Sequence, residues 1–204
     1  ATLLNETGTV LVGAATLDFQ AVDYGGNKVK DHFVLPLDIK QRIIVCGGGH
    51  VAQCLVPVLA AVDFRVTVLE ARPEFARKEL FPAASDVRLV DYTDLATYID
   101  LRPSDFFAIM THGHVHDYTL EEQLLRKDYA YIGVMGSKRK ISSVNARLAE
   151  AGISKEKMAS VHTPIGVKIN AVTPAEIAIS IAAECIAVRA SLREKAISVC
   201  PSNL

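Results

Sequence analysis

The chain contains no tryptophan, and aromatic residues make up only 6% of its 204 residues. Its 22 lysines and arginines are balanced by 23 aspartates and glutamates, so the net charge is −1, and no basic block is present. This balance argues against nucleic acid as the main partner, because nucleic-acid-binding domains concentrate positive charge. No apolar run reaches the ~20 residues of a membrane-spanning helix. The first residues lack the order of a secretion signal, so we expect a cytoplasmic protein.

Cysteine is also scarce, and its spacing matches neither a redox motif nor a zinc motif. The four cysteines are Cys46, Cys54, Cys185 and Cys200. We expect free thiols in a reducing cytoplasm. Cys46 adjoins a glycine cluster, where a reactive thiol is the alternative, but a buried thiol within a strand is the interpretation we favour.

Half of the residues are hydrophobic and 22% are charged, which is typical of a well-filled globular core. From residue 41 to residue 204, strand-like runs alternate with helix-like segments, which predicts an α/β domain with a doubly wound, mainly parallel, Rossmann-like sheet. Residues 1–40 do not follow this alternation. Two or three strand-like runs surround a turn signal at Gly25-Gly26-Asn27, so we expect a short N-terminal β arm or the remnant of an N-terminal domain. The chain opens in mid-pattern, as a piece of a longer protein would.

The hydrophobic pattern predicts the elements of residues 41–204. Strands are expected at residues 43–46, 65–70, 87–90, 106–110 and 129–135. Helices are expected at residues 50–62, 118–127, around 141–152 and 173–189, with at most a short helix at 95–101. The last helix is apolar almost all round, so we expect it to be buried against the sheet or against the other protomer of a homodimer.

The strand at residues 43–46 runs directly into a glycine turn. The turn is Gly47-Gly48-Gly49-His50-Val51-Ala52, which matches the dinucleotide fingerprint G-x-G-x-x-A. Gly47 allows a sharp turn, Gly49 lets a pyrophosphate approach the main chain, and Ala52 lets the helix lie close to the sheet. The helix start offers unpaired N–H groups to phosphates. We therefore predict that Gly47 to Val51 bind a cofactor; the alternative is a tight strand–helix turn of another α/β fold.

An acidic residue completes the fingerprint. Glu70 ends the second strand, about 20 residues after the glycines, where a ribose-binding carboxylate is expected. Arg72 follows closely and is suited to a 2′-phosphate, so the sequence leaves both NAD and NADP open. We predict that both side chains lie in the nucleotide site.

A row of histidines follows the strand at residues 106–110. The segment is Thr111-His112-Gly113-His114-Val115-His116-Asp117. In a doubly wound sheet it lies at the carboxyl end of a central strand, where ligands bind. In an extended chain the histidines face one side, and with Asp117 they form a metal-binding alternative. We favour a site without a metal, with cofactor contacts from Thr111, His112 and His114 and catalytic candidates in His112, His114 and Asp117.

A second glycine-containing turn follows the strand at residues 129–135. It is Gly136-Ser137-Lys138-Arg139-Lys140, and its cations fall in or beside the first turn of the next helix. Each exposed cation at this position destabilises the helix by roughly 0.3–1 kcal/mol, because it is repelled by the positive end of the helix dipole. We therefore predict that Gly136, Ser137, Lys138 and Arg139 bind a cofactor phosphate. The alternative is a solvated basic surface.

The last helix has a well-formed start at Thr173-Pro174-Ala175-Glu176. Thr173 is the predicted N-cap, and Glu176 is the acid of a capping box. Glu176 is also a candidate catalytic residue, and the sequence leaves both roles open.

These motifs, in this order, resemble the C-terminal Rossmann domain of the xanthine dehydrogenase accessory protein family (XdhC/CoxI-like). The resemblance covers about residues 35–190. It rests on Gly47 to Ala52, on Thr111 to His114 with Asp117, on Tyr131 to Lys140, and on Pro164 to Gly166 with Thr173 to Ala178. Two features depart from the family pattern: Glu70 stands where aspartate is common, and the family's N-terminal domain is not recognisable.

The resemblance implies an accessory protein that matures a molybdenum hydroxylase such as xanthine dehydrogenase, by binding molybdenum cofactor, protecting it during sulfuration and delivering it. The expected cofactors are molybdenum cofactor (molybdopterin), NAD(P) or both, and the expected partner is the molybdenum hydroxylase. Such a protein binds its cofactor without turnover of its own. An NAD(P)-dependent oxidoreductase and a nucleotide-sensing interaction domain stay open as alternatives, because the fold does not choose among them.

Overall fold

The computed structural model describes residues 15–22, 28–35, 40–112, 114–136 and 138–199, which fall into two compact units, Ala1–Lys40 and Gln41–Leu204. In the first unit, β1 (Ala15–Val22) pairs in antiparallel fashion with β2 (Lys28–Leu35). The turn expected at residues 25–27 lies outside the described residues. The second unit contains the candidate site and is described from here on.

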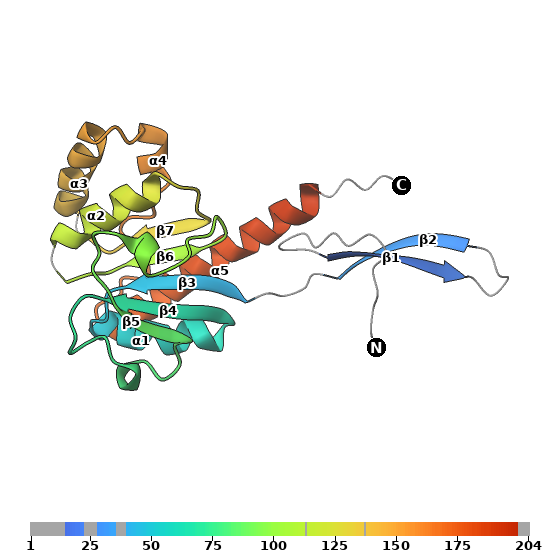
Figure 1. The fold of residues 1–204 in the computed structure, drawn as a ribbon, viewed down its shortest axis with the longest axis horizontal. Helices are drawn as coiled ribbons and strands as arrows, with labels where there is room; N and C mark the ends of the chain where they lie inside the picture. The colour runs from blue at the N-terminus through green and yellow to red at the C-terminus, as the bar shows by residue number, and fades with distance from the viewer. Residues whose placement is uncertain (1–14, 23–27, 36–39, 113, 137, 200–204) are drawn as a thin grey trace. The chain divides into compact units, whose positions relative to one another are not determined.

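A five-stranded parallel sheet forms the centre of the second unit (Figure 1). Its order is β5-β4-β3-β6-β7, so the chain moves outward from β3 in one direction and then returns to build the other half. This order confirms the predicted doubly wound sheet, and it places the topological switch point between β3 and β6. The strands are β3 (Gln41–Cys46), β4 (Phe64–Glu70), β5 (Asp86–Leu89), β6 (Phe106–Ile109) and β7 (Tyr131–Val134).

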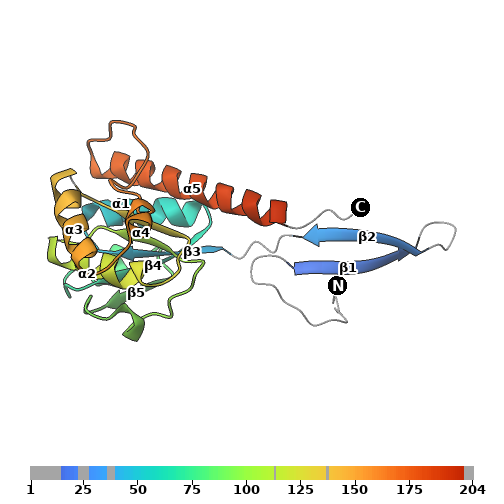
Figure 2. The ribbon, with the colours of Figure 1, turned by 90° about the horizontal axis from the view of Figure 1, so that it is seen from above.

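Helices cover both faces of this sheet. Figure 2 shows α1 and α5 together on one side of β3, and α2 and α3 share a core with the opposite face. The helices are α1 (His50–Ala61), α2 (His114–Leu125), α3 (Lys138–Glu150), α4 (Lys155–Ala159) and α5 (Pro174–Val199), with 3₁₀ turns at Lys78–Leu80 and Leu95–Thr97. Within the described part of the chain, none of the helices has the length and apolar character needed to span a membrane.

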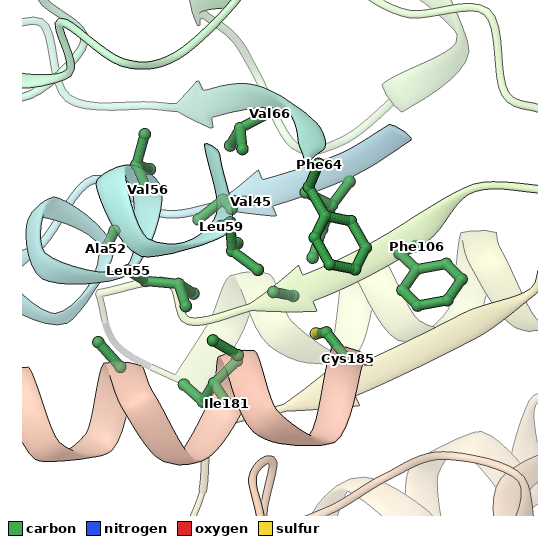
Figure 3. Close-up of a cluster of buried hydrophobic side chains, with 14 of the residues drawn as sticks. Val45, Ala52, Leu55, Val56, Leu59, Phe64, Val66, Phe106, Ile181 and Cys185 are labelled. Atoms are coloured by element: carbon green, nitrogen blue, oxygen red, sulfur yellow. The ribbon is translucent and has the colours of Figure 1, made fainter. Parts of the chain in front are cut away.

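Alternate residues of each strand fill two separate hydrophobic cores. Ile43 and Val45 belong to the core shared with α1 and α5, part of which is drawn in Figure 3. Ile44 and Cys46 belong to the core shared with α2 and α3. All four side chains are fully buried, and burying an aliphatic side chain of this size stabilises a fold by roughly 1.5–3 kcal/mol. The continuous apolar run of β3 is therefore explained by a strand covered on both faces.

Three helices differ from the sequence-based expectation. α2 begins at His114 rather than at residue 118, because Asp117 places a negative charge in its first turn, where the helix dipole favours it. α5 continues to Val199, past the expected end at residue 189, through a segment rich in good helix formers. α4 was not predicted from the pattern; Ser154 caps it by accepting a hydrogen bond from the Lys157 N–H at 3.3 Å.

The predicted burial of α5 against the sheet is confirmed for one face of the helix. Ile181 and Cys185 are fully buried against α1 and the sheet. On another face of the same helix, Ile179 is 52% exposed and Ile186 is 39% exposed. Contact of α5 with the other protomer of a homodimer stays a prediction.

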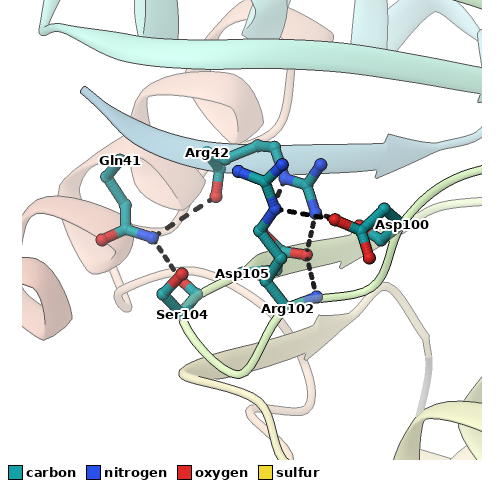
Figure 4. Close-up of polar contacts among 6 residues, drawn as sticks. All are labelled: Gln41, Arg42, Asp100, Arg102, Ser104 and Asp105. Carbon is teal, nitrogen blue, oxygen red and sulfur yellow. Dashed lines mark hydrogen bonds and ion pairs between the residues drawn. The ribbon is translucent and has the colours of Figure 1, made fainter. Parts of the chain in front are cut away.

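An ion pair ties the amino ends of two central strands together (Figure 4). Arg42 of β3 donates from Nε to Asp105 Oδ1 at 2.7 Å, and its Nη2 contacts Asp105 Oδ2. Asp105 is fully buried and also accepts a hydrogen bond from the Arg102 N–H at 2.8 Å. These contacts lie at the edge of the sheet opposite the glycine turn, so they stabilise the two halves without entering the candidate site.

Candidate functional site

The glycine turn lies at the carboxyl end of β3, at the switch point of the sheet. Gly47 has a φ of +117°, and its N–H donates to the Leu69 carbonyl at 2.8 Å. A Cβ at Gly47 would lie 2.4 Å from the Met110 carbonyl oxygen. Only glycine therefore lets the chain turn here while β3 and the end of β6 remain this close.

Gly49, in contrast, faces open space. A Cβ added there would meet no atom within 4 Å, and Gly49 is the N-cap of α1 with an extended backbone. No acidic residue occupies the first turn of α1, and Gly49 has no side chain to cap it. The N–H groups of His50, Val51 and Ala52 have no intrahelical acceptor in a regular helix. The turn therefore has the approach and the polarity that an anion requires.

Glu70 is enclosed beneath this turn. The residue is only 2% exposed, and its Oε2 accepts a hydrogen bond from the Gly48 N–H at 2.7 Å. Its Oε1 accepts from the N–H groups of Ala71 at 2.8 Å and Arg72 at 2.9 Å. Burial favours a higher pKa for Glu70, but hydrogen bonds from Arg72 and Gly48 outweigh it and hold the pKa of this carboxyl below its usual value. Glu70 is therefore a buried carboxylate that shapes the turn.

Arg72 holds the same carboxylate from the solvent side. Its Nε donates to Glu70 Oε1 at 3.1 Å and its Nη2 donates to Glu70 Oε2 at 2.8 Å. The guanidinium lies over the Phe75 ring, with Cζ 4.1 Å from the ring centroid. The structure thus brings Glu70 and Arg72 to the glycine turn, while their contact with a nucleotide stays a prediction.

The histidine segment does not form the extended row that the alternation suggested. His114 and His116 belong to α2, so the backbone here is helical and not extended. The His116 ring packs against Tyr92, with centroids 5.3 Å apart, whereas His112 precedes the helix and is exposed. The side chain of His114 lies outside the described residues. Among those that are described, no three His, Cys, Asp or Glu side chains form a metal-binding group.

Asp117 is fully buried, and its Oδ1 accepts a hydrogen bond from Thr111 Oγ1. This contact fastens the end of β6 to the first turn of α2. Of the residues predicted to contact a cofactor, Thr111 and His112 therefore lie after β6, at the switch point of the sheet. Asp117 holds Thr111 in place through this hydrogen bond. Their contact with a cofactor and any catalytic role stay predictions.

The second turn starts α3 at Lys138, so the three cations occupy its first turn as expected. Ser137 and the side chains of Lys138, Arg139 and Lys140 lie outside the described residues. Gly136 lines a cavity of about 10 Å³, roughly the room of one water molecule. The other lining residues are Glu121, Val134, Ile141, Val144, Asn145 and Thr163.

Glu121 is the residue in this region that the sequence reasoning missed. It is 5% exposed, and burial raises its pKa to about 7. Thr163 Oγ1, also on the cavity wall, is buried and has no hydrogen-bond partner among the described residues. Helical spacing in the sequence could have indicated this burial. Glu121 follows Asp117 by four residues and precedes Leu124 by three, so all three share one face of α2, and that face is buried.

Glu176 forms the predicted capping box. Its Oε2 accepts hydrogen bonds from the N–H groups of Val172 at 2.7 Å and Thr173 at 3.0 Å, and its own N–H donates to Thr173 Oγ1 at 3.2 Å. The hydrogen bonds from Thr173 and Val172 lower the pKa of Glu176. The capping role is confirmed, and the catalytic role has no observation behind it.

The Pro164-Ile165-Gly166 segment is fixed by a partly buried polar cluster. Glu184 of α5 accepts hydrogen bonds from Tyr131 Oη at 2.6 Å and from the Gly166 N–H at 2.8 Å, and lies 3.1 Å from His162 Nδ1. Gly166 has a φ of +100°, and a Cβ there would lie 2.3 Å from Ser180 Oγ. Through Glu184, the segment from Pro164 to Gly166 is therefore connected both to α5 and to Tyr131 of β7.

Cys46 is fully buried, and burial raises the pKa of its thiol to about 12. A thiol in that state is neutral near pH 7 and a poor nucleophile. The interpretation of Cys46 as a buried strand residue is confirmed.

Known proteins share this architecture. A family model described as the XdhC Rossmann domain matches residues 43–185. The chain is 30% identical over 158 residues to YqeB of Escherichia coli (strain K12), described as uncharacterized, covering 77% of this chain and 29% of that protein. It is 29% identical over 157 residues to a protein of Bacillus subtilis (strain 168) described as a probable subunit of xanthine dehydrogenase, covering 77% and 46%. The crystal structure of a xanthine dehydrogenase from Bacillus halodurans matches with a TM-score of 0.68 and 30% identity, over 83% of this chain and 48% of that one.

The parallel sheet, the glycine turn at its switch point and the flanking helices define a Rossmann-type domain. The family match extends from β3 to α5 and includes that turn, so the chain belongs to the family of XdhC Rossmann domains. The chain spans less than half the length of each of these relatives, namely 29%, 46% and 48%.

Proposed function

We propose that this chain acts as an accessory domain in the maturation of a molybdenum hydroxylase such as xanthine dehydrogenase. The match of residues 43–185 to the XdhC Rossmann domain carries the proposal. Two of the relatives are named as xanthine dehydrogenase or a probable subunit of it. In this role the chain binds molybdenum cofactor, NAD(P) or both, and contacts the hydroxylase.

The turn at the end of β3 fits the phosphate portion of either ligand. Gly49 leaves space for a phosphate, and the first turn of α1 contains no acidic side chain to repel it. Backbone N–H groups from Gly49 to Val51 would hold the phosphate, and the exposed His112 would lie nearby at the end of β6. Bound NAD(P) would supply hydride-transfer chemistry, whereas molybdenum cofactor would be cargo.

The glycine fingerprint also favours a second candidate, an NAD(P)-dependent oxidoreductase. The two functions differ in turnover. An oxidoreductase reduces or oxidises the nicotinamide in the presence of a small substrate, whereas an accessory domain binds pterin and hydroxylase without changing the redox state of a nicotinamide. Absorbance at 340 nm, recorded with a panel of small alcohols and acids, separates the two.

The direct test is to identify the ligand. We expect the protein purified from its native cell to release a pterin, a nicotinamide dinucleotide or both, detected by mass spectrometry. Calorimetric titration of the emptied protein with NAD, NADP and free molybdenum cofactor should then show saturable binding of at least one. Folded protein that binds none of the three would refute the cofactor site, and absence of hydroxylase binding in a pull-down would refute the accessory role.

A further inference from the structure

The acid of the dinucleotide fingerprint has no acceptor capacity left for a ribose. The Glu70 carboxylate accepts five hydrogen bonds, from the N–H groups of Gly48 and Ala71 and from the backbone N–H, Nε and Nη2 of Arg72. A carboxylate offers about four lone-pair directions, and this side chain is almost fully buried. A 2′-hydroxyl therefore finds no free acceptor on Glu70.

Arg72, unlike Glu70, still has hydrogen-bonding groups available for a ligand. Nε and Nη2 are used on Glu70, but no described residue accepts a hydrogen bond from Nη1, and the side chain is 28% exposed. Glu70 on one edge and the Phe75 ring beneath one face hold the guanidinium in place. The group is thus ordered before any ligand arrives, which lowers the entropic cost of binding.

The Arg72 guanidinium faces two carboxylates, one buried and one exposed. Glu70 neutralises the guanidinium, and Glu74 is the other carboxylate that acts on it. Glu74 is exposed, so water and salt weaken its field. The remaining donors of the guanidinium match phosphate oxygens in geometry and charge, whereas a ribose hydroxyl offers one neutral acceptor and no negative charge.

We infer that Arg72 binds a 2′-phosphate, so that the nucleotide site selects NADP over NAD. This inference depends on the dinucleotide site proposed above. Glu70 then acts as a positioning residue, because it orients the guanidinium and the Gly48 backbone without contacting the nucleotide.

Calorimetric titration of the full chain with NADP and NAD tests this selection. We expect NADP to bind about tenfold or more tightly than NAD, the effect of one charge-assisted contact. The preference should shrink as salt rises. Arg72→Ala should remove it, whereas Arg77→Ala, which changes an arginine from the same loop, should leave it intact.

Arg72→Ala leaves a buried carboxylate without its partner and threatens folding, so Glu70→Gln provides a second test. This change keeps Arg72 and removes one negative charge beside it. We expect NADP affinity to rise while NAD affinity stays unchanged. If Glu70 bound the ribose itself, the same change would instead lower NAD affinity and leave NADP affinity no higher than in the unchanged chain.

The outcomes separate this inference from the function on which it rests. NAD binding as tightly as NADP, or a preference that survives Arg72→Ala, overturns the role of Arg72 while the nucleotide site stands. Molybdenum cofactor binding with neither dinucleotide bound overturns both the role of Arg72 and the dinucleotide site, and leaves the accessory function standing.

Discussion

Glu121 shows how one buried residue can make the stability of the whole domain depend on pH. Burial raises its pKa from 4.5 to about 7, so the folded protein holds a proton that the unfolded chain loses. Stability is therefore fully present below about pH 4.5 and is lost as pH rises towards 7. A shift of this size is worth on the order of 3 kcal/mol.

We expect Glu121→Gln to abolish this dependence and to stabilise the domain above pH 7 by up to about that amount, measured by urea unfolding between pH 4.5 and 8. Glu122→Gln is the matched control. Glu122 is paired with Arg126 and the pKa of its carboxyl is lowered, so its contribution falls below this pH window. An unchanged pH profile in Glu121→Gln would show that Glu121 is charged in the folded state.

Gly47 and Gly49 belong to one turn but have different roles. Gly47→Ala places a Cβ 2.4 Å from the Met110 carbonyl oxygen at a φ of +117°, so we expect a loss of about 2–4 kcal/mol in unfolding free energy. Gly49→Ala meets no neighbour, so stability should fall by at most about 1 kcal/mol, the cost of alanine in place of glycine at an N-cap, while phosphate-bearing ligands bind more weakly. Chemical unfolding and calorimetry check the pair; equal stability losses would show that both glycines are structural.

At the scale of elements, the start of α3 carries positive charges that disfavour the helix and that a bound phosphate would favour. Lys138, Arg139 and Lys140 occupy the first turn of a helix, where positive charge is unfavourable. We expect Lys138→Ala with Arg139→Ala to stabilise the empty protein by about 0.3–1 kcal/mol per exposed cation, and to weaken a phosphate-bearing ligand most at low salt. Thermal unfolding and a salt series of titrations measure the two effects. If the affinity does not change across the salt series, this turn is a solvated surface and does not bind a phosphate.

The sequence predicted elements best where one local pattern decided them. The apolar run of β3, the glycine turn and the Thr173–Glu176 capping box each contain their own geometry, and the structure confirms them. Period-two spacing places the histidines on one side only in an extended chain, and the structure instead begins α2 at His114. Glu70 fits the fingerprint by position, but its hydrogen bonds to Gly48 and Arg72 depend on tertiary contacts that spacing cannot reveal.

At the scale of the whole molecule, the two ends of the sheet contain different groups. The carboxyl end contains the glycine turn, Arg72 and His112, while the amino end contains the Arg42–Asp105 pair. In a doubly wound fold the ligand binds outside the carboxyl ends of the strands. Changes at the amino end should therefore alter stability without altering ligand affinity.

Asp105→Ala tests this separation. It leaves the mostly buried Arg42 without its partner, and breaking such a pair costs about 3–5 kcal/mol when both groups are enclosed. We expect a loss of about 3 kcal/mol in unfolding free energy, because the partial exposure of Arg42 allows some hydration. Arg102→Ala is the matched control: its ion pair with Asp100 is exposed, so stability should change by less than about 1 kcal/mol. In both variants the affinity for the best-binding cofactor should stay within about twofold of the unchanged chain; a large loss of affinity in folded Asp105→Ala would show that the amino end also shapes the site.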